Sequence, residues 1–120
     1  LGQIEGGFLQ GAGWLTMEEV KWKTNGQITT YSPSTYKIPA VSDMPEKFNV
    51  EIFKDGKNKE NVVNKSKTTG EPPLMNAMSV FFAIKDAISS IGDYDIRPII
   101  DAPATPEKIL MSINKLKAKL

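Results

Sequence analysis

One stretch holds the strongest structural signal in this chain: Pro72-Pro73-Leu74-Met75-Asn76-Ala77-Met78-Ser79-Val80-Phe81-Phe82-Ala83-Ile84-Lys85-Asp86-Ala87-Ile88. Apolar side chains cover nearly all faces before Lys85, which is typical of a helix buried on every side. Proline suits the first helical turn, and Gly92 is a natural stop. We therefore expect one helix over residues 73–91. Its first three turns should be buried, and it needs more partners than 120 residues supply.

A β-hairpin is expected over residues 18–32. Asn25-Gly26 is the strongest short sequence signal for a two-residue hairpin turn. Such a turn places Trp22 opposite Thr29, on a face that we expect to be buried.

Two further segments complete the expected fold. Residues 48–52 alternate between apolar and polar side chains, which predicts a strand. Thr105 as an N-cap followed by Pro106 predicts the start of a last helix. The sequence thus predicts a single α+β domain over residues 1–120, a small antiparallel sheet with a β-hairpin and about three helices.

Composition excludes several kinds of site. The chain has neither cysteine nor histidine, which excludes disulfides, thiolate or imidazole metal sites and histidine catalysis within it. A net charge of +1 gives no electrostatic basis for binding nucleic acid or an anionic membrane surface. No run of about 18 apolar residues is present, so we expect no membrane span. The lack of cysteine suits a cytoplasmic protein. Acid–base chemistry must come from Asp, Glu, Lys or Tyr, and we expect most of the carboxylates Glu5, Glu18 and Glu19 to be solvated.

Glu71 is the carboxylate best placed for chemistry. Two prolines follow it and restrict its backbone to extended or polyproline geometry, while Gly70 lets the chain turn sharply. We expect Glu71 to lie just outside a helix that begins at Pro73. The helix dipole there favours the ionised form that a general base requires. The alternative, which spacing alone favours, is an acidic residue that only stabilises the helix N-terminus.

Glycines recur through residues 2–13, although the apolar side chains there keep helical spacing. On a helix, Gln3, Gly7, Gln10 and Gly11 share one face. A helix that accepts this much glycine lets something approach its backbone closely. A neighbouring helix is the plainer candidate, and a bound cofactor held by the glutamine amides is the other.

Four blocks stand in order along the chain: residues 2–11 (GQIEGGFLQG), 33–40 (PSTYKIPA), 70–87 (GEPPL to SVFFAIKDA) and 101–109 (DAPATPEKI). Together they resemble the xanthine dehydrogenase and aldehyde oxidase family of molybdenum hydroxylases, at nearly the family's spacing. Residues 13–19, and the end of the chain soon after the last helix, look most like the molybdenum-binding large subunit of bacterial two-subunit members.

The resemblance implies that the chain is the C-terminal part of a molybdopterin-binding domain. It implies that Glu71 is the catalytic base, which takes a proton from the hydroxo ligand of a molybdenum–molybdopterin centre while a purine, hypoxanthine or xanthine, is hydroxylated. It also implies that Gln3 contacts the molybdopterin, and that this segment contributes no protein ligand to a metal. Electrons would pass through 2Fe-2S clusters and FAD, bound outside this segment, to NAD. The expected partners are the rest of the molybdenum subunit and the iron–sulfur and FAD subunit or domains.

Some features depart from the family pattern. Thr68-Thr69 stand where the family usually has Ala-Val before Gly70. The family's substrate-orienting arginine, second glutamate and purine-sandwiching phenylalanines lie upstream of such a segment, so we expect the chain alone to be inactive. Two alternatives stay open. One is an aldehyde oxidase or another N-heterocycle hydroxylase of the same family, and the other is a non-catalytic binding or scaffold domain that reuses the fold.

Overall fold

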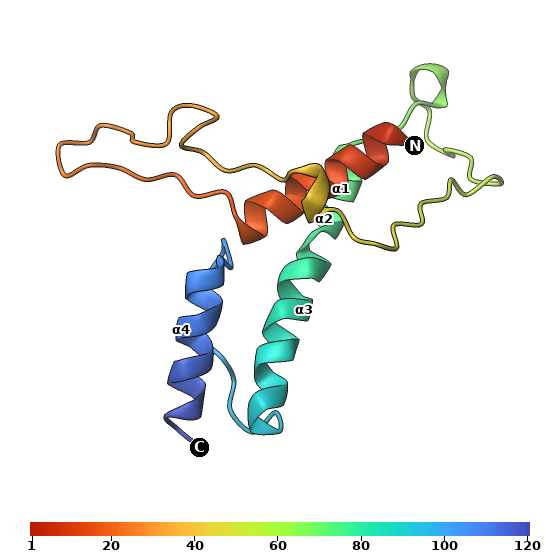
Figure 1. Cartoon of the computed structure of the whole chain (residues 1–120). Helices are drawn as coiled ribbons and strands as arrows, with labels where there is room; N and C mark the ends of the chain where they lie inside the picture. The colour runs from red at the N-terminus through yellow and green to blue at the C-terminus, as the bar shows by residue number, and fades with distance from the viewer.

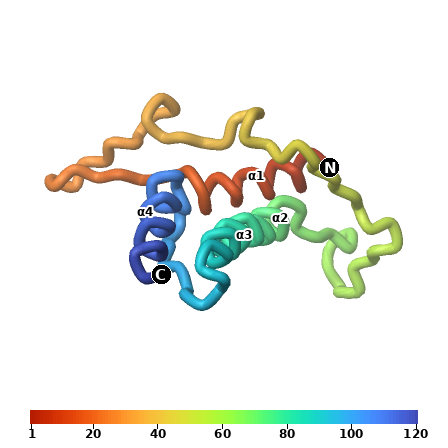
Figure 2. Tube along the Cα trace, turned by 60° about the horizontal axis from the view of Figure 1, so that its bottom comes forward, coloured from red at the N-terminus to blue at the C-terminus, as the bar shows by residue number.

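Helices make up the regular structure of the computed structural model, which describes residues 1–120. The elements are α1 (Gly2–Thr16), η1 (Val41–Asp43), η2 (Val63–Lys65), α2 (Glu71–Asn76), α3 (Met78–Ser89), η3 (Ser90–Gly92) and α4 (Pro106–Lys117). In Figure 1, α1 crosses α2 at the upper end of α3, and α4 runs beside α3. Two long loops extend from this frame on opposite sides, and Figure 2 shows the same arrangement.

The expected antiparallel sheet is absent, so the α+β prediction was wrong. The hairpin persists only as one isolated antiparallel bridge, between Trp22 and Ile28. Residues 48–52 form no strand, because no other segment pairs with their backbone and a strand needs such a partner. The chain is helical with long connecting loops.

The turn at Asn25-Gly26 forms with a longer loop than predicted. The Lys23 amide donates to the Gln27 carbonyl at 2.8 Å. Gly26 has a φ of 81°, the left-handed conformation that closes a three-residue hairpin loop. Trp22 therefore pairs one residue earlier than predicted, and it is 64% exposed, so the predicted buried face was also wrong.

The single helix expected over residues 73–91 is interrupted. α2 ends at Asn76 and α3 begins at Met78, with Ala77 between them at φ −62° and ψ −12°. Ala77 is fully buried at the point where Gly11 of α1 crosses it. The interruption between α2 and α3 therefore lies where Ala77 packs against α1.

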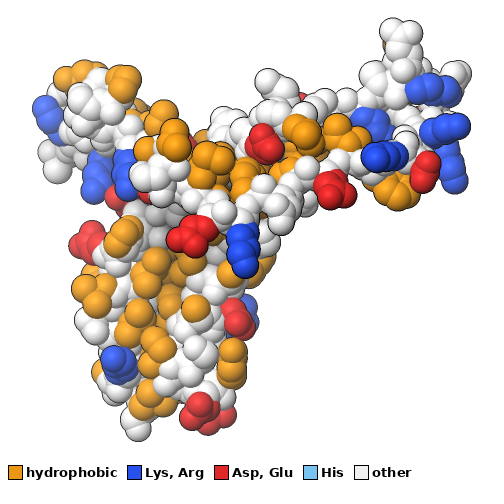
Figure 3. All heavy atoms as spheres, turned by 45° about the vertical axis from the view of Figure 1, so that its right-hand side comes forward, with side chains coloured by type: hydrophobic (Ala, Val, Ile, Leu, Met, Phe, Trp, Pro, Cys, Tyr) orange, Lys and Arg blue, Asp and Glu red, His pale blue; other side chains and the backbone are white.

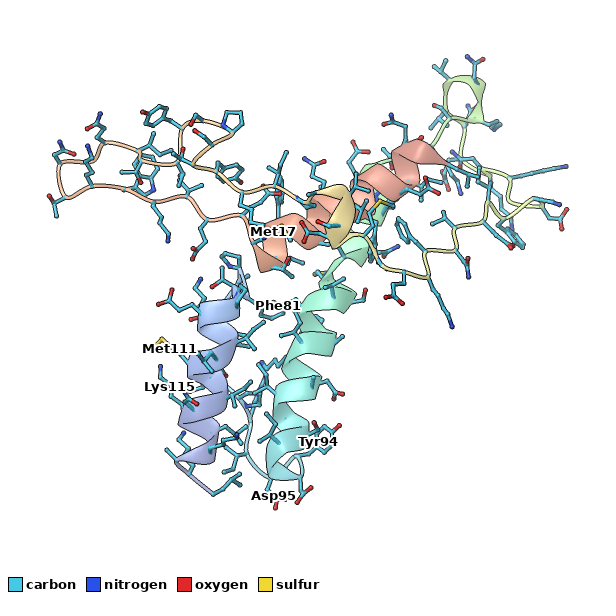
Figure 4. All side chains as sticks on the ribbon, in the orientation of Figure 1. Met17, Phe81, Tyr94, Asp95, Met111 and Lys115 are labelled. Carbon is cyan, nitrogen blue, oxygen red and sulfur yellow. The ribbon has the colours of Figure 1, made fainter.

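The main hydrophobic cluster joins α3 and α4. Its buried members are Ile88, Ile100, Ala104 and Leu116, with Phe81, Ile84, Ile96, Ile109 and Ile113 packed against them. Figure 4 shows Phe81 on the side of α3 that faces α4, whereas Met111 and Lys115 lie on the outer side of α4. This cluster holds the two helices side by side.

The start of α4 confirms the predicted cap. The Thr105 side chain accepts a hydrogen bond from the Lys108 amide at 3.4 Å. Just before it, the Ala104 amide donates to the Leu15 carbonyl at 2.7 Å. Lys108 also pairs with Glu19 at 3.7 Å. These contacts tie the α3–α4 pair to the end of α1.

Much of the apolar surface is open. Only 11 of 120 residues are buried, and the radius of gyration is 18.2 Å. A compact domain of this length would have a radius of gyration of roughly 13–14 Å. Figure 3 shows hydrophobic side chains over the exposed face of the lower arm of the molecule. The prediction that the first three turns of the apolar helix are buried was wrong for the chain by itself.

The segment Glu71–Gly92 is long and apolar enough to cross a membrane by length and composition alone. Only 11% of its most apolar window is buried within the chain. The core helix of a soluble protein meets the same two conditions, so this is weak evidence. The expectation of no membrane span stays a prediction.

We predict that the purified chain self-associates through the exposed face of α3. Phe82 is 59% exposed, whereas its neighbour Phe81 packs into the α3–α4 cluster. Phe82→Ser should therefore reduce association and keep the helical content. Phe81→Ser should lower the free energy of unfolding by about 2 kcal/mol. Light scattering with circular dichroism tests both variants, and a purely monomeric wild type would contradict the prediction.

Candidate functional site

The glycine face of α1 packs against the backbone of α2. A Cβ added at Gly7 would overlap the Gly70 carbonyl oxygen. One added at Gly11 would overlap the Leu74 carbonyl oxygen and lie 2.8 Å from the Ala77 Cβ. The helices approach this closely because both positions lack a side chain. The interpretation that a neighbouring helix occupies this face is confirmed for Gly7 and Gly11.

A cavity of about 380 Å³ lies beside this contact. Its lining residues are Gly2, Gln3, Gly6, Gly7, Gln10, Gly70, Glu71 and Leu74. α1 supplies both glutamines, and the first turn of α2 supplies the only carboxylate. The structure thus brings Gln3 and Glu71, which are far apart in the sequence, to one cavity.

The cavity is open and polar. A Cβ added at Gly2 or Gly6 would meet nothing within 4 Å, so the α1 backbone is accessible there. Gln3, Gln10 and Glu71 are all exposed. A flat polar ligand could therefore reach both amides and the carboxylate. The chain contains no group of three or more His, Cys, Asp or Glu side chains placed to hold a metal ion.

Glu71 is the first residue of α2, so the prediction of an extended Glu71 outside the helix was wrong. Gly70 is the N-cap at φ −92° and ψ −35°, and its carbonyl accepts the Leu74 amide at 3.1 Å. The first turn of a helix needs no amide donors, so Pro72 and Pro73 fit there at no cost in hydrogen bonds. The helical bond from Gly70 to Leu74 outweighs the preference of a residue before proline for extended geometry. Glu71 stands at the positive end of a short helix.

A second cavity, of about 420 Å³, lies on the other side of Gly6 and Gln10. It is formed by α1 and the segment 38–44, and its lining is mostly apolar, with Trp14 at one wall. Glu18 is its only ionisable lining residue. Each cavity thus has one carboxylate, but the second is lined mostly by apolar side chains, whereas the first has two amides and open glycine backbone beside its carboxylate.

The hydrogen-bond partner of Glu18 was not predicted from the sequence, which indicated only that most of Glu5, Glu18 and Glu19 are solvated. The Tyr36 hydroxyl donates a hydrogen bond to a Glu18 carboxylate oxygen at 2.6 Å. This hydrogen bond, with smaller contributions from desolvation and the Glu18 charge, raises the pKa of Tyr36 above its ordinary value. The contact fastens the segment around Tyr36 to the end of α1. No periodicity links the two residues, so no sequence signal indicated it.

The Tyr36–Glu18 contact predicts a titration behaviour. In a chain whose other tyrosines are removed (Tyr31→Phe and Tyr94→Phe), Tyr36 should ionise above its usual pKa of about 10. Glu18→Gln should bring the pKa back toward that value. Because the folded-state pKa is raised, the contact stabilises the fold below pH about 10 and this contribution is lost as pH rises through the raised pKa. Tyrosinate absorbance measures both, and equal curves with and without Glu18 would count against the contact.

Comparison with known proteins bears on the cavity. Residues 1–45, which include Gln3 and Gln10, match the family described as a molybdopterin cofactor-binding domain. The chain is 48% identical over 115 residues to the xanthine dehydrogenase/oxidase of Mus musculus. It is 46% identical over 123 residues to the xanthine dehydrogenase of Oryza sativa subsp. japonica. It is 44% identical over 123 residues to xanthine dehydrogenase 1 of Arabidopsis thaliana.

The chain is similar to a segment of xanthine dehydrogenases. The three matches cover 91%, 93% and 93% of this chain, but the chain spans only 8%, 9% and 9% of the length of these relatives. The relatives are animal and plant enzymes, so they support the likeness to xanthine dehydrogenases and not the bacterial type that the sequence predicted.

Proposed function

We propose that residues 1–120 are the C-terminal part of the molybdopterin-binding domain of a molybdenum hydroxylase of the xanthine dehydrogenase type, and that they form one wall of its catalytic site. The observation that carries this proposal is the cavity shared by Gln3 of α1 and Glu71 of α2. The similarity to xanthine dehydrogenases over nine-tenths of the chain supports it.

The residues of the cavity fit a pterin cofactor. The amides of Gln3 and Gln10 can both donate and accept hydrogen bonds, as the edge of a pterin ring requires. The open backbone at Gly2 and Gly6 lets a flat ring come close to α1. When bound, the molybdopterin supplies the molybdenum centre at which the substrate is oxidised. We assign to Gln3 a direct contact with it.

Glu71 acts as the general base in this proposal. It accepts a proton as a purine, hypoxanthine or xanthine, is hydroxylated in turn to xanthine or urate. Its carboxylate stands in the first turn of α2, beside the cavity that Gln3 also lines. The backbone around it is stiff, because Pro72 and Pro73 follow and the Gly70 carbonyl lies against α1. A stiffly held base costs little reorganisation when the proton moves.

The remainder of the enzyme completes the site and covers the apolar surface. We assign the exposed faces of α3 and of the hairpin to contact with the rest of the molybdenum subunit, which also accounts for the apolar segment Glu71–Gly92 without a membrane. In the full enzyme, 2Fe-2S clusters and FAD bound on the partner subunit or domains would supply the electron transfer, with NAD as acceptor. The proposed setting is a cytoplasmic enzyme, with the two-subunit bacterial organisation as the expected form. The 120-residue chain alone is inactive in this proposal.

The role of Glu71 can be separated from that of an ordinary helix-end acid. In the full parent enzyme, Glu71→Gln should lower xanthine turnover by about 100- to 10,000-fold, because the proton acceptor is lost. Molybdenum content should not change. Glu107→Gln is the matched control: Glu107 likewise lies next to a proline in the first turn of a helix, α4, but is not among the residues that line the cavity.

Three outcomes decide the assignment. Loss of turnover in Glu71→Gln alone supports a base. Similar small effects in both variants would return Glu71 to the role of a helix-end carboxylate and favour a non-catalytic domain. A wild-type enzyme that ignores xanthine would refute the purine assignment and make aldehydes and other N-heterocycles the next substrates to assay.

The assignment of Gln3 predicts weaker retention of the cofactor. Gln3→Leu in the parent enzyme removes one amide hydrogen-bonding group and should weaken cofactor binding by about fivefold, the equivalent of one hydrogen bond of about 1 kcal/mol. Molybdenum and pterin retained after dialysis measure this. Gln27→Leu, at the hairpin tip, is the control that should retain both. Full retention in Gln3→Leu would contradict the contact.

A further inference from the structure

We propose that Gly11 is a positioning residue for Glu71, because it sets the distance between α1 and the short helix that carries the base. The inference rests on the proposed function of Glu71. It concerns how this chain holds Glu71 in place beside Gln3, and not the chemistry at the cofactor.

The contact at Gly11 involves groups that cannot move aside easily. A Cβ at Gly11 would overlap the Leu74 carbonyl oxygen and lie 2.8 Å from the Ala77 Cβ. The Leu74 carbonyl accepts the Ala77 amide at 3.2 Å, so it is fixed within the helical turn. Gly11 is buried, and Ala77 is fully buried. An added methyl group at Gly11 must therefore push α2 away from α1.

A displacement of α2 reaches Glu71 because the helix is short. α2 has six residues, and Glu71 and Leu74 lie one helical turn apart within it. A shift of about 1 Å at Leu74 is transmitted to the carboxylate, and a misplacement of that size can cost about 100-fold in rate. Gln3 stands on α1 itself, so the same displacement changes the separation of the two assigned site residues.

Gly7 makes a second contact of the same kind. A Cβ at Gly7 would overlap the Gly70 carbonyl oxygen. That carbonyl accepts the Leu74 amide at 3.1 Å and belongs to the residue directly before Glu71. We therefore expect Gly7→Ala to displace Glu71 as well and to lower kcat in the same direction as Gly11→Ala.

The test uses the full parent enzyme with turnover expressed per bound molybdenum. Gly11→Ala should lower kcat about 100-fold with little change in KM, because the base and not the substrate pocket is displaced. Gly92→Ala is the matched control. Gly92 is also buried, and its added Cβ would lie 3.1 Å from a Leu116 methyl group in the α3–α4 cluster. It should alter stability and leave kcat per molybdenum unchanged.

Compensation distinguishes positioning from simple destabilisation. Ala77→Gly removes one of the two groups that the Gly11→Ala methyl would strike. The double variant should regain part of the lost kcat, although the added glycine lowers helix stability further. If Gly11 only stabilises the fold, Ala77→Gly added to Gly11→Ala should lower both kcat and stability further.

A double-mutant cycle links the effect to the base. Gly11→Ala added to Glu71→Gln should cause little further loss of turnover, because no base is left to misplace. Full additivity would overturn the proposal. A crystal structure of Gly11→Ala provides a readout independent of activity, and an unmoved Glu71 there would also overturn it.

One further variant applies if Gly11→Ala yields no folded enzyme. Glu71→Asp withdraws the carboxylate by one methylene without touching α1, and it should reproduce the loss of kcat. Full activity in Glu71→Asp would show that carboxylate position does not matter and would refute positioning.

Two results separate this inference from the proposed function. If Glu71→Gln itself keeps full turnover, the proposed function fails. If Glu71→Gln is inactive while Gly11→Ala is fully active, only the positioning inference fails.

Discussion

The backbone contact between α1 and α2 determines the rest of this structure. Gly7 and Gly11 let the two helices meet with main-chain atoms against main-chain atoms. That closeness places Gln3 and Glu71 on one cavity, and it coincides with the break at Ala77 where α2 passes into α3. Glycine in a helix interior costs about 1 kcal/mol relative to alanine. Two glycines on one face of α1 are nevertheless present, because any larger side chain there would prevent the backbone of α2 from coming this close.

Local signals predicted the first and last helices well, the apolar helix only in part, and the sheet badly. The cap at Thr105, the proline after it and the glycine-bearing helix at the start of the chain depend on neighbouring residues, and all three appear in the structure. A strand depends on a partner that can be far away in sequence. Residues 48–52 have the alternating pattern but no paired backbone, so the pattern alone could not produce a sheet. The hairpin register differed because Gly26 closes a three-residue loop, which the Asn-Gly signal does not distinguish from a two-residue one.

The candidate site was predictable in its residues but not in its geometry. Helical spacing placed Gln3 and Gly7 on one face, and the stiff proline pair singled out Glu71. Neither signal shows that the two segments meet, since that depends on packing between parts of the chain more than fifty residues apart. The backbone preference before proline also misplaced the start of α2. The Tyr36–Glu18 hydrogen bond went unseen for the same reason: the partners are joined by tertiary packing alone.

The apolar character of α3 and the openness of the cavity have one physical explanation. A helix with apolar side chains on nearly all faces is stable in water only when most of its surface is covered. Yet Phe82 and Met78 remain exposed, and Gln3 and Glu71 line a cavity open to solvent. The relatives in which this segment recurs are more than ten times its length. Enclosure by such a larger protein would remove the apolar surface from water and would also exclude solvent from around the Glu71 carboxylate. Burial of α3 would then fix α2 from one end while α1 fixes it from the side, so the packing that stabilises the segment would also hold Glu71 in place.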